Sequence, residues 1–318
     1  MFIFVVGERN QFRSFVNQLS LNFVQSATML SDKRFLPPVL EITEDGSHTL
    51  YVPELNEHYH STHGAMQEST HIFIREGLIH RHLFNHPVQH EQPELQHGPE
   101  AQRQLSQEQS LQSSRAINVL EIGFGTGLNA LLTLLEAKKR KINVFYQTLE
   151  RYPISVEAAQ RLNYPATLNR LEKDTTVDTP IQSSQNDLNV AKLRNNTFEK
   201  LFLQLHTSSW EKPTAITPGF TMLKQQIDFS QPVTFIPEKS FDLIYYDAFA
   251  PEKQPEMWTQ EIFNHIYSLS NQGAILTTYC AKGVVRRRLQ AAGFQVERLQ
   301  GPPGKREILR ATKPYTER

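Results

Sequence analysis

The sequence predicts an α/β fold in which helices cover both faces of a mostly parallel sheet. Three observations indicate it: strand and helix patterns alternate along the second half of the chain, a glycine-rich turn joins the first of these strands to its helix, and one later strand is apolar almost throughout. With 318 residues, 39% of them apolar, the chain can form one large α/β domain and a smaller elaboration.

The alternating elements begin near residue 116 and continue to residue 311. In order, we expect a strand at Ala116–Ile122, a helix at Leu128–Lys138, strands at Val144–Leu149 and Phe241–Tyr246, a helix at Pro255–Leu269, a strand at Ala274–Thr278, a helix at Gly283–Ala292, and strands at Phe294–Leu299 and Glu307–Ala311. Phe241–Tyr246 is the nearly continuous apolar strand, which predicts burial on both of its faces. The last two strands, joined by a Gly-Pro-Pro-Gly segment, form a closing hairpin.

The sequence pattern before residue 116 predicts a small β-rich unit. Apolar runs at Val39–Thr43 and Thr49–Val52 flank an Asp45-Gly46 turn, which is typical of a β-hairpin, and a helix is expected at Gly64–Ile74. We therefore divide the chain into an N-terminal extension without clear periodicity (1–36), a subdomain bordering the site (37–84), an insertion (85–114) and the main domain (115–318).

Two polar stretches interrupt this organisation. Residues 85–114 hold eight glutamines, with histidines and prolines and almost no large apolar residue, and residues 174–197 are similarly polar. Neither stretch can bury enough apolar surface to fold alone, so we interpret both as insertions.

Composition excludes several classes of protein. The single cysteine, Cys280, excludes an internal disulfide and a cysteine-cluster metal site. No apolar run approaches the roughly 18 residues that a membrane span needs, and the N-terminus does not resemble a signal peptide, so we expect a cytoplasmic protein. No long apolar helix invites pairing, and we expect a monomer.

Charge is balanced over the chain but not within it. The 33 basic and 33 acidic residues cancel, whereas Cys280–Arg318 holds ten Lys or Arg against three Glu. This local excess suits a phosphate-backbone ligand such as RNA, and it is also compatible with a solvated face that binds nothing. His58, His60 and His63 lie close in sequence, but no carboxylate or cysteine spacing accompanies them, so we expect no metal site.

The glycine loop Gly123–Gly127 carries the first chemical signal. Glycines let the backbone turn sharply and approach a ligand, although dinucleotide enzymes use similar loops. Glu121, just before the loop, can meet an ammonium group and would repel a pyrophosphate. Glu150, at the end of the next strand, can accept hydrogen bonds from ribose hydroxyls. Together the two acids favour S-adenosylmethionine, which carries an amino acid and a ribose, over a dinucleotide.

Asp247 carries the second signal, because it directly follows the buried strand Phe241–Tyr246. Ligands of open parallel sheets bind beyond the carboxyl ends of the strands, so Asp247 should face the same crevice as the glycine loop. An acid there can orient an amine nucleophile and hold its departing proton. Phe249, two residues later, is either a stacking platform for a base or a core residue.

Longer segments add a family resemblance. These are His58–Ser61 with Gly64–Ser69, EIGFGTGLNALLT from Glu121, YYDAFAPEKQPEMWTQEIF from Tyr245, and Gly273–Ala311. The chain resembles the methyltransferase domain of the bifunctional tRNA 5-methylaminomethyl-2-thiouridine biosynthesis family (MnmC). The resemblance implies a class I, Rossmann-like methyltransferase fold with a mostly parallel seven-stranded sheet. It also implies methylation of the amine of 5-aminomethyl-(2-thio)uridine at the tRNA wobble position, with S-adenosyl-L-methionine as donor.

The resemblance also implies roles for individual residues. Asp247 matches the family's active-site aspartate. The cofactor would be held by residues of the N-terminal segment, the glycine loop and the following strand: Glu68, Glu121, Gly123, Gly125, Gly127 and Glu150. Asp228 aligns loosely with an acid near the adenine. From charge alone, we expect the tRNA backbone at Lys282, Arg286, Arg287, Lys305 and Arg306.

The chain departs from the bifunctional family in one respect. It shows no second dinucleotide fingerprint and ends shortly after the matching part, so we expect methyl transfer alone, without the flavin oxidase activity. Three alternatives stay open: a class I methyltransferase acting on a small-molecule or protein amine, a non-catalytic module that binds tRNA or S-adenosylmethionine, and a nicotinamide dehydrogenase. Glu121 argues against the last of these.

Overall fold

The structure is a computed structural model that describes residues 36–85, 115–174, 197–231 and 235–315. The predicted N-terminal extension and the two polar insertions therefore lie almost wholly outside the described residues. Within these ranges, every helix is too short or too polar to cross a membrane.

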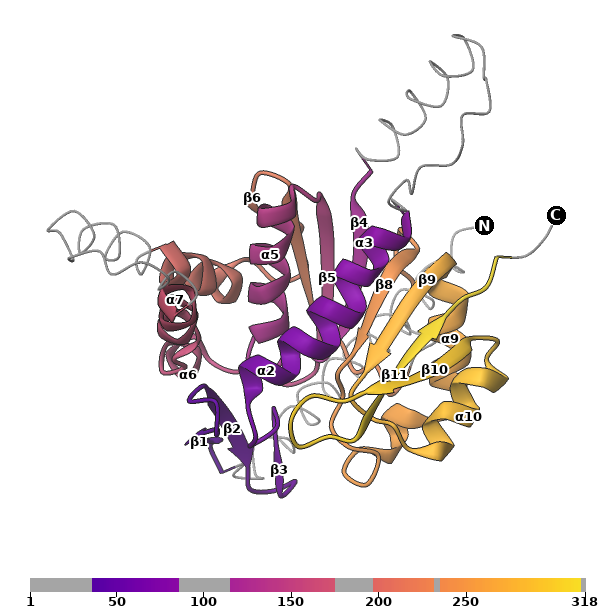
Figure 1. The fold of residues 1–318 in the computed structure, drawn as a ribbon, viewed down its shortest axis with the longest axis horizontal. Helices are drawn as coiled ribbons and strands as arrows, with labels where there is room; N and C mark the ends of the chain where they lie inside the picture. Colours follow the sequence, from indigo (N-terminus) through magenta and orange to yellow (C-terminus); the bar gives the residue numbers. More distant parts are fainter. Residues whose placement is uncertain (1–35, 86–114, 175–196, 232–234, 316–318) are drawn as a thin grey trace, which may run out of the picture.

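The main sheet has eight strands, with a parallel centre and antiparallel edges (Figure 1). Across the sheet they are β10 (Gln295–Gln300), β11 (Glu307–Thr312), β9 (Ser270–Thr278), β8 (Phe241–Tyr246), β4 (Ile117–Ile122), β5 (Val144–Glu150), β7 (Phe220–Gln226) and β6 (Thr214–Thr217). The strands from β9 to β7 are parallel, and β10, β11 and β6 pair antiparallel with their neighbours. The mostly parallel α/β fold is confirmed, with one strand more than the seven expected.

Strand β8 lies between two hydrophobic layers, one on each face of the sheet. Leu243 and Tyr245 pack into the layer beneath α5 (Leu128–Arg140) and the long N-terminal helix, whereas Ile244 and Tyr246 pack into the opposite layer. The second layer is covered by α9 (Gln260–Leu269) and α10 (Gly283–Ala291). The apolar run of β8 is therefore buried on both faces, as its composition predicted.

The N-terminal helix is longer and less regular than expected. It consists of α2 (Ala65–Ser69), a π-helix (η1, Thr70–Ile79) and α3 (His80–Asn85), whereas the sequence predicted an end at Ile74. The π-helix lies across α5, β8 and β9. At Gly77 a β-carbon would lie 3.0 Å from the ring of Tyr245, so the absent side chain permits this close packing.

The predicted hairpin forms a separate antiparallel sheet of β1 (Val39–Ile42), β2 (His48–Val52) and the short β3 (Glu57–His58). The turn between β1 and β2 contains Gly46 at a φ of 79°. The chain that leaves β3 continues directly into the wall of the pocket described below, so this small sheet positions residues of the site.

Several elements between residues 151 and 258 were not predicted. They are α6 (Val156–Gln160), α7 (Tyr164–Asp174), a helix at 197–207, and strands β6 and β7. The predicted helix Pro255–Leu269 is divided into a 3₁₀ turn (η3, Pro255–Trp258) and α9. Strand β7 is informative because it buries a lysine, Lys224, whose Nζ donates a hydrogen bond to the His206 carbonyl at 2.6 Å. Because Lys224 occupies a buried position, the alternating pattern of this strand does not look apolar in the sequence.

Replacing a central isoleucine should test the double-sided burial of β8. We expect Ile244→Ala to lower the free energy of unfolding by about 2–5 kcal/mol, because it leaves a cavity between packed layers. The matched control is Ile236→Ala, at a side chain that is 85% exposed, with an expected change within about 0.5 kcal/mol. Urea unfolding followed by tryptophan fluorescence measures both. Equal effects in the two variants would contradict this packing.

Candidate active site

A pocket of about 390 Å³ opens at the carboxyl ends of β4, β5 and β8. Its walls come from the glycine loop, the residues after β5, β7 and β8, and the segment after β3. This is the edge at which open parallel sheets bind ligands, since the strand order and the loops leave a crevice there. The sequence predicted this position for the site.

The glycine loop forms one wall, and its conformation requires glycine. Gly123, Gly125 and Gly127 have φ values of 93°, 51° and 75°, which side chains rarely tolerate. A β-carbon on Gly123 would lie 2.8 Å from the Asp247 carbonyl oxygen, and one on Gly125 would lie 2.8 Å from the Tyr59 ring. The loop therefore approaches both neighbouring segments more closely than any other residue would allow.

Glu150 ends β5 and fastens the loop. Its two carboxylate oxygens accept backbone hydrogen bonds from Gly125 at 3.0 Å and from Tyr152 at 2.7 Å. Burial raises the pKa of Glu150, and these hydrogen bonds oppose that rise. The carboxylate lines the pocket with lone pairs still available to a ligand.

Asp247 lines the pocket beside the glycine loop. Asn129, in the first turn of α5, donates a hydrogen bond to its Oδ2 at 2.8 Å. Burial and, secondly, the negative charge of Glu68 raise the pKa of Asp247 to about 7, while Asn129 and Lys305 oppose that rise. This side chain can therefore exchange a proton near neutral pH.

Glu68 and Lys305, which the sequence analysis also named, both line the pocket, and the position of Lys305 was not expected. Glu68, on α2, lines the pocket as predicted. Lys305 was expected on the outer basic surface, but it lines the pocket and pairs with Glu68, Nζ to Oε1, at 3.2 Å. The hairpin loop between β10 and β11 turns this lysine inward, so its charge belongs to the site.

Phe249 lies at the pocket with an aromatic partner. Its ring meets that of Tyr59 edge to face, with centroids 5.1 Å apart, and both residues line the cavity. Trp258 fixes the backbone of Phe249, because its Nε1 donates to the Phe249 carbonyl at 2.8 Å. Phe249 is thus a pocket residue and not a residue of the core.

Glu121 and Gly127 do not line the pocket. Alternation along β4 turns Glu121 toward α5, where its carboxylate is fully buried and accepts a hydrogen bond from Thr148 Oγ1 at 2.7 Å. Burial raises the pKa of Glu121 to about 8. Gly127 caps the start of α5. The Glu121 carboxylate, which we expected to meet an ammonium group, therefore lies behind the pocket wall and not in its lining.

The expected tRNA-binding residues divide by exposure. Arg287 and Arg306 are exposed, and so is Lys282, which pairs with Glu252. Arg286 is half-buried, with its Nε enclosed among the described residues without a hydrogen-bond partner. The basic surface that remains outside the pocket is therefore smaller than the sequence suggested.

Sequence reasoning missed several lining residues. Asn129 could have been found, because it is a polar residue in the otherwise apolar first turn of α5.

The three histidines near the pocket do not form a cluster. His60 is buried, its Nε2 lies 2.7 Å from Thr126 Oγ1, and burial lowers its pKa to about 4. His58 and His63 each face a glutamate of the N-terminal sheet, Glu41 and Glu44. The three histidines thus have separate partners. Asp228, just beyond β7, does line the pocket and pairs with Arg151 at 3.0 Å.

Comparison with known proteins identifies the chemistry. A family model described as "S-adenosyl-L-methionine-dependent methyltransferase" matches residues 198–314, which include Asp247 and Lys305. The chain is an S-adenosyl-L-methionine-dependent methyltransferase.

Relatives place this methyltransferase near one group of bifunctional proteins. The tRNA 5-methylaminomethyl-2-thiouridine biosynthesis bifunctional proteins MnmC of Burkholderia mallei (strain NCTC 10229) and Burkholderia pseudomallei (strain K96243) are each 27% identical to it, over 289 and 288 residues. The match covers 87% of this chain but 36% of each relative, so the chain spans about a third of their length. The crystal structure of MNMC2 from Aquifex aeolicus shares the fold, with a TM-score of 0.57 at 19% identity over 97% of this chain and 85% of that one.

The contact between Gly123 and Asp247 makes a specific prediction for this methyltransferase. We expect Gly123→Ala to weaken the binding of S-adenosylhomocysteine at least about tenfold, and to lower stability by about 1–3 kcal/mol, because its β-carbon meets a backbone carbonyl. Gly283→Ala is the matched control, since its β-carbon would meet only the flexible end of Arg287 at 3.2 Å. Isothermal titration and thermal unfolding measure the two effects. Wild-type affinity in Gly123→Ala would exclude the loop from the cofactor site.

Proposed function

We propose that this methyltransferase methylates the amine of 5-aminomethyl-(2-thio)uridine at the wobble position of tRNA, giving 5-methylaminomethyl-(2-thio)uridine. The observation that carries the proposal is Asp247, an acid with a pKa near neutrality at the end of β8, in a pocket rich in carboxylates. The name of the bifunctional relatives supports the choice of nucleoside.

The charge of the pocket supports both the donor and the acceptor. Two ordinary cations, Arg151 and Lys305, line it, and the carboxylates outnumber them: Glu57, Glu68, Glu150, Asp228, Asp247 and Glu256. A negative cavity attracts a sulfonium, an ammonium or a protonated amine, and it repels a pyrophosphate. This argues for an amine acceptor and against a dinucleotide enzyme.

The residues of the pocket fit S-adenosyl-L-methionine. Gly123 and Gly125 present backbone without side chains to the pocket, and Glu150 offers carboxylate lone pairs to a ribose diol. When bound, this cofactor supplies a methyl group on a positively charged sulfur, which takes back the bonding electron pair as the carbon passes to an amine nitrogen. We assign the amino-acid end to the acidic wall near Glu68, and the adenine side to Asp228.

Asp247 is the residue to which we assign proton transfer. A neutral amine nitrogen is the nucleophile, so the proton of the bound ammonium, or of the methylated product, must reach an acceptor. Asp247 presents a carboxylate to the cavity, and Asn129 fixes its orientation. Because its pKa is about 7, Asp247 is substantially ionised at neutral pH and becomes more so as the pH rises.

The surface outside the pocket supports an RNA substrate. Arg306 directly follows the pocket residue Lys305, Lys282 immediately precedes α10 and Arg287 lies within that helix, and all three cations are exposed outside the acidic cavity. Phosphates are attracted to the cations and excluded from the cavity, whereas an uncharged base with a pendant ammonium can enter. The rings of Tyr59 and Phe249 offer that base an apolar contact.

One experiment tests the substrate directly. tRNA that carries 5-aminomethyl-2-thiouridine is incubated with the protein and S-adenosyl-L-methionine, and its nucleosides are analysed by mass spectrometry. We expect one added methyl group on the wobble nucleoside. Methylation of a free amine compound or a protein lysine, with no change in the tRNA, would replace this proposal by the small-molecule or protein alternative. Cofactor binding without any transfer would support a non-catalytic module.

Removing the proposed proton acceptor should separate chemistry from binding. We expect Asp247→Ala to lower methyl transfer by about a hundred- to ten-thousandfold while cofactor affinity changes by less than about tenfold. In the unsubstituted protein the transfer rate should rise with pH through about 7, as Asp247 loses its proton. Glu238→Ala, at an exposed acid just before the opposite end of β8, is the control and should leave transfer unchanged. Near wild-type turnover in Asp247→Ala would refute the role.

Reversing one exposed charge should test the RNA surface. We expect Arg287→Glu to weaken tRNA binding and to reduce the slope of log affinity against log salt by about one, since one phosphate contact is lost. Lys139→Glu makes the same change at the C-terminal end of α5, away from the pocket, and should have little effect. Filter binding at several salt concentrations distinguishes them. An unchanged slope in Arg287→Glu would move the RNA surface elsewhere.

A further inference from the structure

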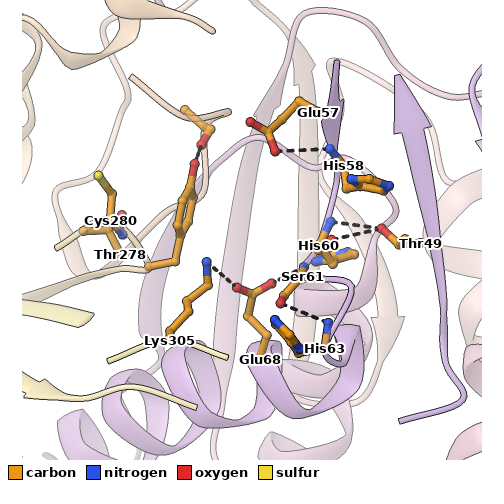
Figure 2. A network of polar contacts seen from close by, with 12 residues as sticks. Thr49, Glu57, His58, His60, Ser61, His63, Glu68, Thr278, Cys280 and Lys305 are labelled. Atoms are coloured by element: carbon orange, nitrogen blue, oxygen red, sulfur yellow. Dashed lines mark hydrogen bonds and ion pairs between the residues drawn. The ribbon is translucent and has the colours of Figure 1, made fainter. Parts of the chain in front are cut away.

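Three side chains from distant segments meet at one side of the pocket. Glu68 comes from α2, Asp247 follows β8, and Lys305 comes from the loop between β10 and β11. Figure 2 shows Lys305 pointing at Glu68, with Ser61 on the other side of the carboxylate. Glu68 therefore uses one oxygen for the ion pair at 3.2 Å and the other for the Ser61 backbone N–H at 2.7 Å.

This ion pair is held in place from several directions. The Glu68 side chain is 9% exposed and that of Lys305 is 26% exposed. Lys305 Nζ lies 4.7 Å from the centroid of the Tyr279 ring, and Tyr279 is itself anchored through its hydroxyl, which donates to the Ala248 carbonyl at 2.8 Å. Tyr279 thus links the lysine to Ala248, the residue that follows Asp247. The charge of Lys305 therefore lies at the pocket, close to both acids.

If the methyl acceptor is an amine, the net charge around Glu68 and Asp247 decides how readily that amine loses its proton. Two carboxylates beside a bound ammonium would both stabilise its proton, and an ammonium has no lone pair with which to attack. A cation that pairs with one of the carboxylates removes part of that stabilisation. The pocket contains such an arrangement, since Lys305 forms an ion pair with Glu68, whereas Asp247 accepts a hydrogen bond from the uncharged Asn129.

We propose that Lys305 is a positioning residue that cancels the charge of Glu68, so that a bound amine gives its proton to Asp247 and is not held as an ammonium by both acids. The proposal rests on the proposed amine methyltransferase function and names the residues that tune its acceptor site. Lys305 touches neither reacting atom in this scheme, and it acts through Glu68 and the local field.

Other titratable groups around this corner do not replace Lys305. His60 is neutral near pH 7, because burial lowers its pKa to about 4, and burial raises the pKa of both Tyr279 and Cys280, which keeps them uncharged. His63 lies against Gly304 and pairs with Glu44. The other acids near the corner are Glu57, on β3, Asp45, in the β1–β2 turn, and Glu121, on β4. Burial raises the pKa of Glu121 to about 8, and the charge of Asp247 is a lesser cause, but Glu121 lies behind the pocket wall. Among the described residues lining this side of the pocket, Lys305 is therefore the cation opposed to these carboxylates.

The test compares Lys305→Met, Glu68→Gln and the double variant Glu68→Gln/Lys305→Met. The substrate is an anticodon stem-loop RNA with 5-aminomethyluridine, and a matched RNA with plain uridine isolates the contribution of the amine to binding. The turnover number is measured against pH, and RNA affinity is measured in the presence of S-adenosylhomocysteine. Thermal unfolding reports whether each variant is folded.

Opposite shifts are expected for the two single variants. In Lys305→Met, uncancelled Glu68 should raise the pKa of the bound amine, so turnover at pH 7 falls about tenfold and recovers at higher pH, while the amine-dependent part of RNA affinity increases. In Glu68→Gln, the unpaired lysine should move the profile to lower pH and weaken the amine-dependent affinity. The double variant should return both quantities toward those of the unsubstituted protein.

Two outcomes would overturn the inference. One is a loss of turnover in Lys305→Met without a change in the pH profile, and the other is a failure of the double variant to recover although it unfolds at the same temperature as the unsubstituted protein. Either would make the ion pair merely structural. If the unsubstituted protein methylates neither the aminomethyl RNA nor any other amine, the proposed function fails and this inference fails with it. Normal transfer with unshifted variants rejects the inference alone.

Discussion

The site depends on the close approach of two strand ends in the centre of the sheet. β4 and β8 are parallel neighbours, and where they end the backbone at Gly123 reaches the carbonyl of Asp247. The glycine loop and the acid are thereby fixed relative to each other by main chain alone, without any flexible side chain between them. Strands buried on both faces hold this geometry, since neither can shift without disturbing a packed layer.

Charge is separated over a short distance around this centre. Carboxylates gather inside the pocket, whereas the exposed cations of α10 and of the β10–β11 loop lie outside it. Such an arrangement distinguishes two parts of one ligand: a backbone that is anionic and a group that is cationic. Lys305 is the exception that joins the two regions, because its loop belongs to the outer surface and its charge lies within.

The sequence predicted the elements whose signal is local. The glycine loop, the apolar strand β8 and the β1–β2 hairpin each depend on a few adjacent residues, and each was placed closely. β7 was missed because Lys224 in its buried face is stabilised by a carbonyl and two aromatic rings from elsewhere. The inward turn of Glu121 and the inward position of Lys305 were missed for a similar reason. Both orientations depend on tertiary contacts with residues far away in the sequence, and a local sequence pattern does not reveal such contacts.

The order of the strands makes the site depend on segments that are far apart in the sequence. β11 lies between β9 and β10 in the sheet, although it is the last strand in sequence. The loop that precedes β11 supplies Lys305, whose partner Glu68 belongs to the first described helix. During synthesis, Glu68 is made long before its lysine partner, so this side of the pocket is incomplete until the β10–β11 hairpin has formed. Such long-range closure makes folding slow, and it ensures that a prematurely terminated chain has an open sheet edge and no finished pocket.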